Sequence, residues 1–378
     1  MSLHLYAQFK LFLLKGIPAI VISFMLILAA CNTNTTQQIP VEEEIKDEVS
    51  PSIPLNPLKA DGLKEGFIYE SASFPECHAS TLVELSGGKL MAAWFGGTHE
   101  KNPDVTIWAA VYEDDNWGPM RELADGIQND SLRYPCWNPV LFQHRNGTLY
   151  LFYKVGPNPR DWWGEMKYSL DDGETWSYAE RIPKGNIGPV RAKPIELDNG
   201  DLLCPSSLEY IGGNWKVHME TYRPSTNFWG KIQVDPNTRF DAIQPTILRH
   251  SEKDLQILCR SRQNRIVEAT SSDNGRTWSA FSASQLPNPS AGIDGLTLSY
   301  GQQVLVYNPT EDGPNDRAKL NLAYSVDGKN WNDILKLEDQ LTGEFSYPAI
   351  IQTSDGLLHI TYTWKRQRIK HMIVKVER

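Results

Sequence analysis

The chain has 378 residues, of which 40% are hydrophobic and 22% are charged, and this balance excludes a disordered chain, a collagen-like repeat and a protein with many membrane spans. Lys and Arg total 37 against 46 Asp and Glu, which gives a net charge of −9. An acidic chain without a basic block is a poor match for nucleic acid, so no nucleic-acid partner is expected. The 27 Gly and 24 Pro residues favour many short elements over long helices.

The N-terminus has the pattern of an export signal. An uncharged apolar run over residues 16–30 follows two lysines, and it is shorter than the roughly 20 residues of a membrane-spanning helix. The run ends in Leu28-Ala29-Ala30-Cys31, which resembles the cleavage box of bacterial lipoproteins. The resemblance implies a signal peptide over 1–30, a lipidated Cys31, and attachment to a membrane of the bacterial cell envelope, facing the periplasm or the cell surface. A plain secretory signal with an incidental cysteine is the alternative.

The segment 31–63 is polar, acidic and dotted with proline, and it has no apolar periodicity. This composition predicts a flexible tether. The globular part is then expected over 64–378, a length that one all-β domain can span. Its four cysteines form no CxxC pair and no zinc-type spacing, so we predict that most of them are buried free thiols. No metal and no cofactor are expected.

The globular part is repetitive. From about residue 66 onward, six hairpins of short β-rich runs with Gly-containing turns recur about every 50 residues. Between them, the pattern S-x-D-x-G-x-T-W occurs at 169–176 and 271–278, with a shorter copy at 325–331. Four-stranded units that cannot bury a face alone predict an all-β fold, a six-bladed β-propeller. A pair of β-sandwiches is the alternative, but it does not explain the period.

The last repeat lacks a strand. Only one strand, over 369–375, follows the final hairpin. The segment 66–71 at the other end of the domain is predicted to supply the missing strand. The ring would then be closed by the N-terminal strand, which removes an open sheet edge.

The repeated turns are identified as Asp-boxes, and the six units resemble the sialidase (neuraminidase) superfamily of BNR-repeat propellers. The stretches Glu76-Cys77-His78-Ala79-Ser80-Thr81 and Trp94-Phe95-Gly96-Gly97 resemble more narrowly the "predicted neuraminidase" proteins of bacteria and plants. In each box we expect the Ser and Asp to form local hydrogen bonds in the turn and the Trp to pack between strands. The boxes are therefore assigned a structural role.

Candidate site residues follow from propeller geometry. Inner strands start near the central funnel, so residues just before each first strand and just after each second strand converge on one pocket. Before first strands the sequence has His78, Trp137, Asn138, Arg191, Lys193, Gln244, Asp294 and Tyr347. After second strands it has Glu100, Asp104, Lys154, Glu209, Arg260, Arg262, Asn308, Trp364 and Arg366.

Cations are frequent among the candidates although the protein is acidic. The cationic group comprises Arg191, Lys193, Arg260, Arg262 and Arg317. These cations favour a glycan partner with an anionic sugar, such as a sialic or uronic acid, whose remaining contacts would come from Asn138, Gln244 and Asn308. The alternative is that some of the cations pair with neighbouring carboxylates as part of the scaffold.

The family resemblance implies roles for individual residues. Sialidases hold a sugar carboxylate with three arginines, and they use an Asp acid/base and a Tyr nucleophile paired with a Glu. Tyr347 matches the nucleophile, and Asp104, with Glu100 as its rival, matches the acid/base. Arg260 or Arg262 fits the second arginine and Arg317 the third. Two positions depart from the pattern: His78 or its neighbours stand where the first arginine belongs, and Gln244 stands near the position of the Glu.

Three functions follow from these residues. The first is an exo-acting glycosidase of sialidase type that releases a terminal acidic sugar outside the cytoplasm. In it Tyr347 is nucleophile or proton donor, Trp137 a stacking wall, and His78 a polar contact or a general acid or base. The second is a lyase, or another glycosidase, acting on a uronate-containing glycan; in the lyase His78 or Tyr347 is the base and the arginines stabilise the enolate. The third is a non-catalytic glycan-binding lipoprotein, and the fold alone does not choose among them.

Overall fold

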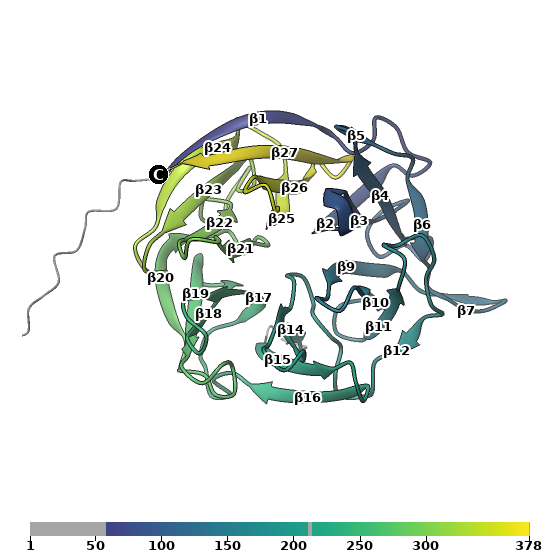
Figure 1. Cartoon of the computed structure of the whole chain (residues 1–378), viewed down its shortest axis with the longest axis horizontal. Coiled ribbons are helices and arrows are strands. Elements are labelled where there is room, and N and C mark those ends of the chain that lie inside the picture. Colours follow the sequence, from purple (N-terminus) through teal and green to yellow (C-terminus); the bar gives the residue numbers. More distant parts are fainter. Residues whose placement is uncertain (1–57, 211–213, 378) are drawn as a thin grey trace, which may run out of the picture. The chain divides into compact units, whose positions relative to one another are not determined.

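The computed structural model describes residues 58–210 and 214–377. The chain divides into two units, Met1–Pro54 and Leu55–Arg378, and the first unit, with the expected signal peptide and Cys31, lies outside the described residues. The second unit is a ring of six antiparallel sheets (Figure 1), which confirms the predicted six-bladed propeller. Its described part contains strands and one 3₁₀ turn, η1 (Ser86–Gly88), and no helix there is long and apolar enough to cross a membrane.

In blades 1 to 3 the strands follow one another outward in chain order. Blade 1 consists of β2 (Glu76–Glu84), β3 (Leu90–Gly97), β4 (Thr106–Glu113), β5 (Asn116–Trp117) and β6 (Arg121–Ala124). A separate hairpin of β7 (Ile127–Asn129) and β8 (Leu132–Arg133) follows it. Blade 2 consists of β9 (Cys136–Gln143), β10 (Leu149–Val155), β11 (Trp163–Ser169) and β12 (Glu180–Arg181). Blade 3 consists of β13 (Ile195–Glu196), β14 (Leu202–Glu209), β15 (Trp215–Arg223) and β16 (Phe228–Gln233).

Blades 4 and 5 repeat this order, and blade 6 joins the two ends of the domain. Blade 4 consists of β17 (Ala242–Arg249), β18 (Leu255–Ser261), β19 (Arg265–Ser271) and β20 (Ser282–Pro287). Blade 5 consists of β21 (Asp294–Thr297), β22 (Gln303–Tyr307), β23 (Lys319–Ser325) and β24 (Asn332–Asp339). Blade 6 consists of β25 (Phe345–Gln352), β26 (Leu358–Trp364), β27 (Arg368–Glu377) and, outermost, β1 (Lys59–Phe67).

The ring is closed by β1, as predicted, but this strand starts earlier than the sequence indicated. It pairs with β27 from Lys59 opposite Glu377 to Phe67 opposite Lys370. Residues 59–63, which were expected in the tether, therefore belong to blade 6. Most side chains of this outermost strand are exposed, so main-chain hydrogen bonds hold it and no apolar alternation marks it in the sequence.

The hydrophobic core is distributed between the blades. Six apolar clusters lie among the described residues, one at each junction between neighbouring blades. At the closing junction, Ile369 of blade 6 packs in one cluster with Leu82 and Trp94 of blade 1. Each blade thus buries its two faces only when both neighbours are present, which explains why the repeat must close into a ring. The four cysteines are buried free thiols, as expected.

The Asp-boxes stabilise their turns through hydrogen bonds between residues of the same box. In the first box the carboxylate of Asp171 accepts a hydrogen bond from the Thr175 backbone N–H at 2.9 Å, and Trp176 Nε1 donates to the Gly173 carbonyl at 3.0 Å. The other two boxes use their Asp and Trp in the same way. These contacts confirm the structural role predicted for the boxes.

A histidine pair bridges the junction where the ring closes. Trp117 Nε1 of blade 1 donates to His371 Nδ1 of blade 6 at 3.2 Å. His371 must then carry its proton on Nε2, which lies 3.0 Å from His359 Nδ1. Burial lowers the pKa of His371 to about 3 and also holds the pKa of His359 below its ordinary value. A second proton on His371 would turn the acceptor of Trp117 into a donor and break this bridge.

We expect the propeller to lose stability in mild acid at this junction. The unfolded chain binds a proton on His371 near pH 6.5 while the folded chain does not, so stability present above pH 6.5 is lost as the pH falls toward 3. The expected loss from this residue is about 2–3 kcal/mol between pH 6.5 and pH 4.5. Urea unfolding at the two pH values measures it, and His371→Phe should flatten the dependence. An unchanged pH dependence in the variant would show that other groups control acid unfolding.

Candidate functional site

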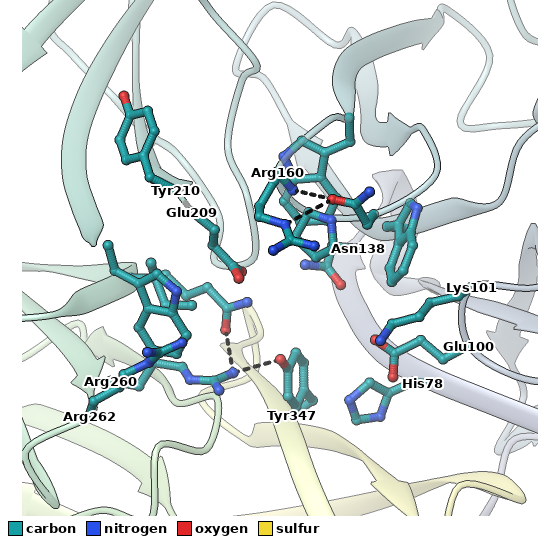
Figure 2. Close-up of a pocket in the computed structure, with 17 residues that line it drawn as sticks. His78, Glu100, Lys101, Asn138, Arg160, Glu209, Tyr210, Arg260, Arg262 and Tyr347 are labelled. Carbon is teal, nitrogen blue, oxygen red and sulfur yellow. Dashed lines mark hydrogen bonds between the residues drawn. The ribbon is translucent and has the colours of Figure 1, made fainter. Parts of the chain in front are cut away.

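A pocket of about 490 Å³ lies where inner strands begin and second strands end, within the size range of small-ligand sites (Figure 2). Blades 1, 2, 3, 4 and 6 contribute to it. Its lining consists of His78, Glu100, Lys101, Trp137, Asn138, Asn158, Pro159, Arg160, Trp162, Glu209, Tyr210, Trp215, Ile243, Gln244, Arg260, Arg262 and Tyr347.

The structure brings half of the candidate site residues together in the pocket. Those in the lining are His78, Glu100, Trp137, Asn138, Glu209, Gln244, Arg260, Arg262 and Tyr347. Those outside the lining are Asp104, Lys154, Arg191, Lys193, Asp294, Asn308, Arg317, Trp364 and Arg366. Residues at strand ends therefore do converge on one pocket, but only some of the side chains at each strand end belong to its lining.

A β-bulge in the inner strand explains how several of these side chains reach the pocket. In β9, β17 and β25 the pairing register slips where Asn138, Gln244 and Tyr347 stand. Each of the three has a positive φ, of 40°, 56° and 54°, which is unusual for residues other than glycine. A bulge re-aims a side chain that would otherwise alternate across the sheet. The strained backbone thus places three polar side chains at the funnel.

The sequence around each bulge fits this geometry. A proline follows each of the three bulged residues. Proline has no backbone N–H to donate, and a bulge tolerates it because the extra residue of the bulge is not paired with the neighbouring strand. The freed N–H of Gln244 donates to Ser207 Oγ in blade 3 at 3.1 Å. The equivalent N–H of Ala79 in blade 1, also at positive φ, donates to Thr363 Oγ1 in blade 6 at 3.1 Å. The bulges therefore also tie neighbouring blades together.

Tyr347 and Arg260 form the centre of the pocket. Arg260 Nη1 donates to Tyr347 Oη at 2.7 Å and to Gln244 Oε1 at 3.3 Å (Figure 2). The tyrosine oxygen therefore faces a guanidinium group, and the Gln244 amide occupies the position where the family resemblance placed a Glu. A cationic donor at this oxygen stabilises negative charge that develops on it.

His78 packs directly against Tyr347, with ring centres 4.0 Å apart. It is buried, and burial together with the positive charges of Arg366, Arg317, Arg191 and Arg260 holds its pKa well below its ordinary value. His78 is therefore a poor proton donor at physiological pH, which disfavours a role as general acid. Its Nδ1 is buried and has no hydrogen-bond partner among the described residues.

Glu100 belongs to a chain of ion pairs at the pocket edge. Its carboxylate accepts from Arg366 Nη1 at 2.5 Å, and Arg366 Nε contacts Glu344 at 3.1 Å. Arg317, the expected third arginine, pairs with the same Glu344 at 3.2 Å. Burial alone would raise the pKa of Glu344, but Arg366 and Arg317 outweigh it and hold that pKa below its ordinary value. Arg317 is thus a scaffold residue in this structure.

Asp104 is not part of the pocket lining. Both of its carboxylate oxygens accept hydrogen bonds from the Thr98 backbone N–H, at 3.2 and 3.1 Å, and one also accepts from Thr98 Oγ1 at 2.6 Å. Glu100, on the same loop between β3 and β4, lines the pocket instead. Of the two candidates for the acid/base role, only Glu100 therefore lines the pocket.

Three other expected ligands support the site from outside its lining. Arg191 is buried and donates to the carbonyl of Pro348, the residue after Tyr347. Lys193 pairs with buried Asp294 at 2.5 Å. Asn308 donates to the carbonyl of Phe345 at 2.8 Å. Asp294 in turn accepts a hydrogen bond from the Ile350 backbone N–H of β25 at 3.0 Å, so all three residues hold β25 in place without lining the pocket.

Some lining residues come from positions that the sequence did not single out. The loop between β10 and β11 brings Arg160 and Trp162, the connection after β14 brings Tyr210, and the first residue of β15 is Trp215. Trp162 packs edge-to-face on Trp137 at 5.8 Å, and Trp137 is only 2% exposed. The half-buried Trp162 is therefore the more accessible aromatic surface. The adjacent Trp162 and Trp163, which follow a polar segment, are the sequence signal that could have indicated this aromatic surface.

The balance of charges shows what the pocket can bind. Arg160, Arg260, Arg262 and Lys101 outnumber the two carboxylates in the lining, Glu100 and Glu209. Together with the indole rings, these cations suit a sugar ring that carries an acidic group. No cluster of His, Cys, Asp or Glu that could hold a metal ion is found in the part of the chain that the structure describes.

Comparison with known folds agrees with this architecture. A protein of unknown function from Dyadobacter fermentans superimposes with a TM-score of 0.70 at 15% identity, covering 84% of this chain and 99% of that one. The NanB sialidase from Streptococcus pneumoniae gives 0.64 at 12%, covering 82% and 70%. The leech intramolecular trans-sialidase gives 0.63 at 14%, covering 84% and 70%. These likenesses confirm the resemblance to sialidase propellers at the level of the fold.

The sequence itself carries the family assignment. The family model described as a BNR repeat-like domain matches residues 88–360, which is most of the chain. No curated protein matches the sequence. The chain belongs to the BNR repeat-like family.

Proposed function

We propose that this protein is an exo-acting glycoside hydrolase of sialidase type that releases a terminal acidic sugar from glycans. The observation that carries the proposal is the contact between Arg260 Nη1 and Tyr347 Oη, 2.7 Å long, at the centre of a pocket with excess positive charge. A neutral tyrosine suits a substrate with a carboxylate beside the anomeric carbon, because a carboxylate nucleophile would be repelled.

The roles of individual residues follow from their places in the pocket. Tyr347 Oη attacks the anomeric carbon, and its proton leaves to water. Arg260 and Arg262 hold the acidic group of the sugar, while Trp162 and Trp215 line the sides where a ring can stack. His78 lines the pocket beside Tyr347, where it is a polar contact for the sugar.

A lyase acting on a uronate-containing glycan is the second candidate. It is favoured by one specific feature: the residue beside Arg260 and Tyr347 is Gln244, which cannot take the tyrosine proton as a Glu would. A Tyr347 oxygen stabilised by Arg260 could then act as the base that removes the proton alpha to the uronate carboxylate.

We also propose that the chain is exported and anchored in the cell envelope through a lipidated Cys31, so that the pocket meets glycans outside the cytoplasm. The support is the sequence Leu28-Ala29-Ala30-Cys31 behind an apolar run of signal-peptide length. A polar linker after Cys31 would let the enzyme reach extended substrates.

A substrate panel tests the proposed function. The purified protein is offered sialic-acid, uronic-acid and neutral hexose glycosides with the same fluorogenic leaving group, and we expect turnover of an acidic glycoside at least about 10²-fold above the neutral one. Equal turnover of the neutral glycoside would contradict the acidic specificity. Uronate oligosaccharides are read in parallel for new reducing ends and for ultraviolet-absorbing product. An unsaturated product would identify the lyase, and binding without turnover would identify a glycan-binding protein.

A further inference from the structure

Glu209 is a pocket carboxyl group to which the family resemblance gives no role. It stands at the end of β14, half-buried, and Figure 2 shows its side chain pointing into the pocket from the wall that also carries Tyr210. Among the described residues, no side chain forms a hydrogen bond or close ion pair with its carboxyl group. The only other carboxyl group in the lining, Glu100, is bound to Arg366 at 2.5 Å.

The surroundings of Glu209 differ from those of an ordinary surface carboxylate. Burial raises its pKa, and the negative charge of Glu100 adds to this, while Arg260, Arg262 and Arg160 oppose it without cancelling it. These four charged groups come from the β3–β4 loop, the β10–β11 loop, and β18 with the loop after it. Two carboxyl groups of one pocket are thus held differently, one in an ion pair and one free, which is the arrangement that separates an ionised group from a proton donor.

We infer that Glu209 is the catalytic residue that donates the proton to the leaving oxygen of the glycosidic bond. This inference rests on the proposed function. As the bond from the anomeric carbon to the leaving oxygen breaks, its electron pair stays on that oxygen, which takes the Glu209 proton. Tyr347 Oη forms the new bond to carbon and gives its own proton to water. In the second step a water oxygen attacks the same carbon and gives one proton to the Glu209 carboxylate. The bond from that carbon to Tyr347 Oη breaks, its electron pair stays on Oη, and Oη regains a proton from solvent water.

A pair of leaving groups tests the donor role. Glu209→Gln keeps the shape of the side chain but removes the transferable proton. With the acidic sugar accepted by the wild type, we expect the variant to lose on the order of 10²-fold in kcat on a sugar leaving group, and less than tenfold on an activated nitrophenyl group that needs no proton. Glu268→Gln is the matched control, because Glu268 in β19 is also half-buried with a raised pKa but lies outside the pocket. Equal losses on both leaving groups, or a rise in KM alone, would overturn the inference.

A spectroscopic measurement decides the question even if no substrate is turned over. Infrared difference spectra of the full chain, recorded as a function of pH, should show a protonated carboxyl band that persists above pH 4.3, the approximate pKa of an ordinary glutamate. Glu209→Gln should remove one part of this band and Glu268→Gln a different part. If Glu209→Gln leaves the band unchanged, Glu209 is ionised and the inference falls. If the band is assigned to Glu209 but the wild type hydrolyses no glycoside, the proposed function fails while the proton-donor state of Glu209 stands.

Discussion

Tyr347→Phe is expected to lower kcat on an acidic glycoside by about 10⁴-fold or more, the scale seen when a nucleophile is removed from a catalytic unit. The substitution deletes only Oη, the atom that Arg260 contacts at 2.7 Å. The ring itself stays packed against His78, with ring centres 4.0 Å apart. Because the aromatic packing is kept, sugar binding should change little, and the loss should lie in the chemical step. Steady-state turnover and ligand binding, measured separately, check both parts.

Tyr307→Phe is the matched control for that experiment. Tyr307 in β22 donates from Oη to Asp333 at 3.0 Å, and neither residue lines the pocket. Its loss should leave turnover unchanged and affect only stability. If Tyr347→Phe retained activity within tenfold of the wild type, the tyrosine would not be the reacting group, and water activated by the pocket carboxylates would become the nucleophile.

Local signals predicted the scaffold because its repeats are defined by neighbouring residues. The Asp-box turn is held by contacts within a few residues, such as Trp176 Nε1 to the Gly173 carbonyl, so its sequence pattern predicts its structure directly. The hairpins are also defined locally, by short β-rich runs and by the Gly-containing turns between them. The start of β1 was misplaced for the opposite reason: it is an exposed edge strand whose position depends on pairing with β27, at the other end of the domain.

The sequence predicts the site residues whose positions are fixed by the ends of inner strands. It does not predict which side chains are drawn toward or away from the pocket by contacts with distant residues. Gln244 and Tyr347 stand at bulges in inner strands, so their place in the funnel follows from the fold. Asp104 and Glu100 share one loop, yet Thr98 turns the first aside while Arg366, from the far end of the chain, lies against the second. Pattern and spacing carry no information about such a contact.

Arg260 is the second residue for which we expect a large effect. It donates to Tyr347 Oη, Gln244 Oε1 and Ser290 Oγ and is buried, so Arg260→Met removes three hydrogen bonds and one charge from the centre of the pocket. Losing a buried, hydrogen-bonded charge typically costs several kcal/mol, and we expect kcat/KM on the acidic glycoside to fall by about 10³-fold. The neutral glycoside should respond much less, because it offers no charge for Arg260 to hold.

Arg262→Met separates this specific role from the general positive charge of the pocket. Arg262 stacks its guanidinium on Trp215 at 4.2 Å, and Arg260 contacts the same ring at 5.6 Å, so both variants lose a cation beside one tryptophan. Only Arg260 also reaches Tyr347. We therefore expect Arg262→Met to lower kcat/KM by tenfold or less, roughly the worth of a partly solvated charge contact. Equal losses in the two variants, at matched melting temperatures, would mean that the pocket attracts its substrate by net charge alone and that the Arg260–Tyr347 contact has no special part in the chemistry.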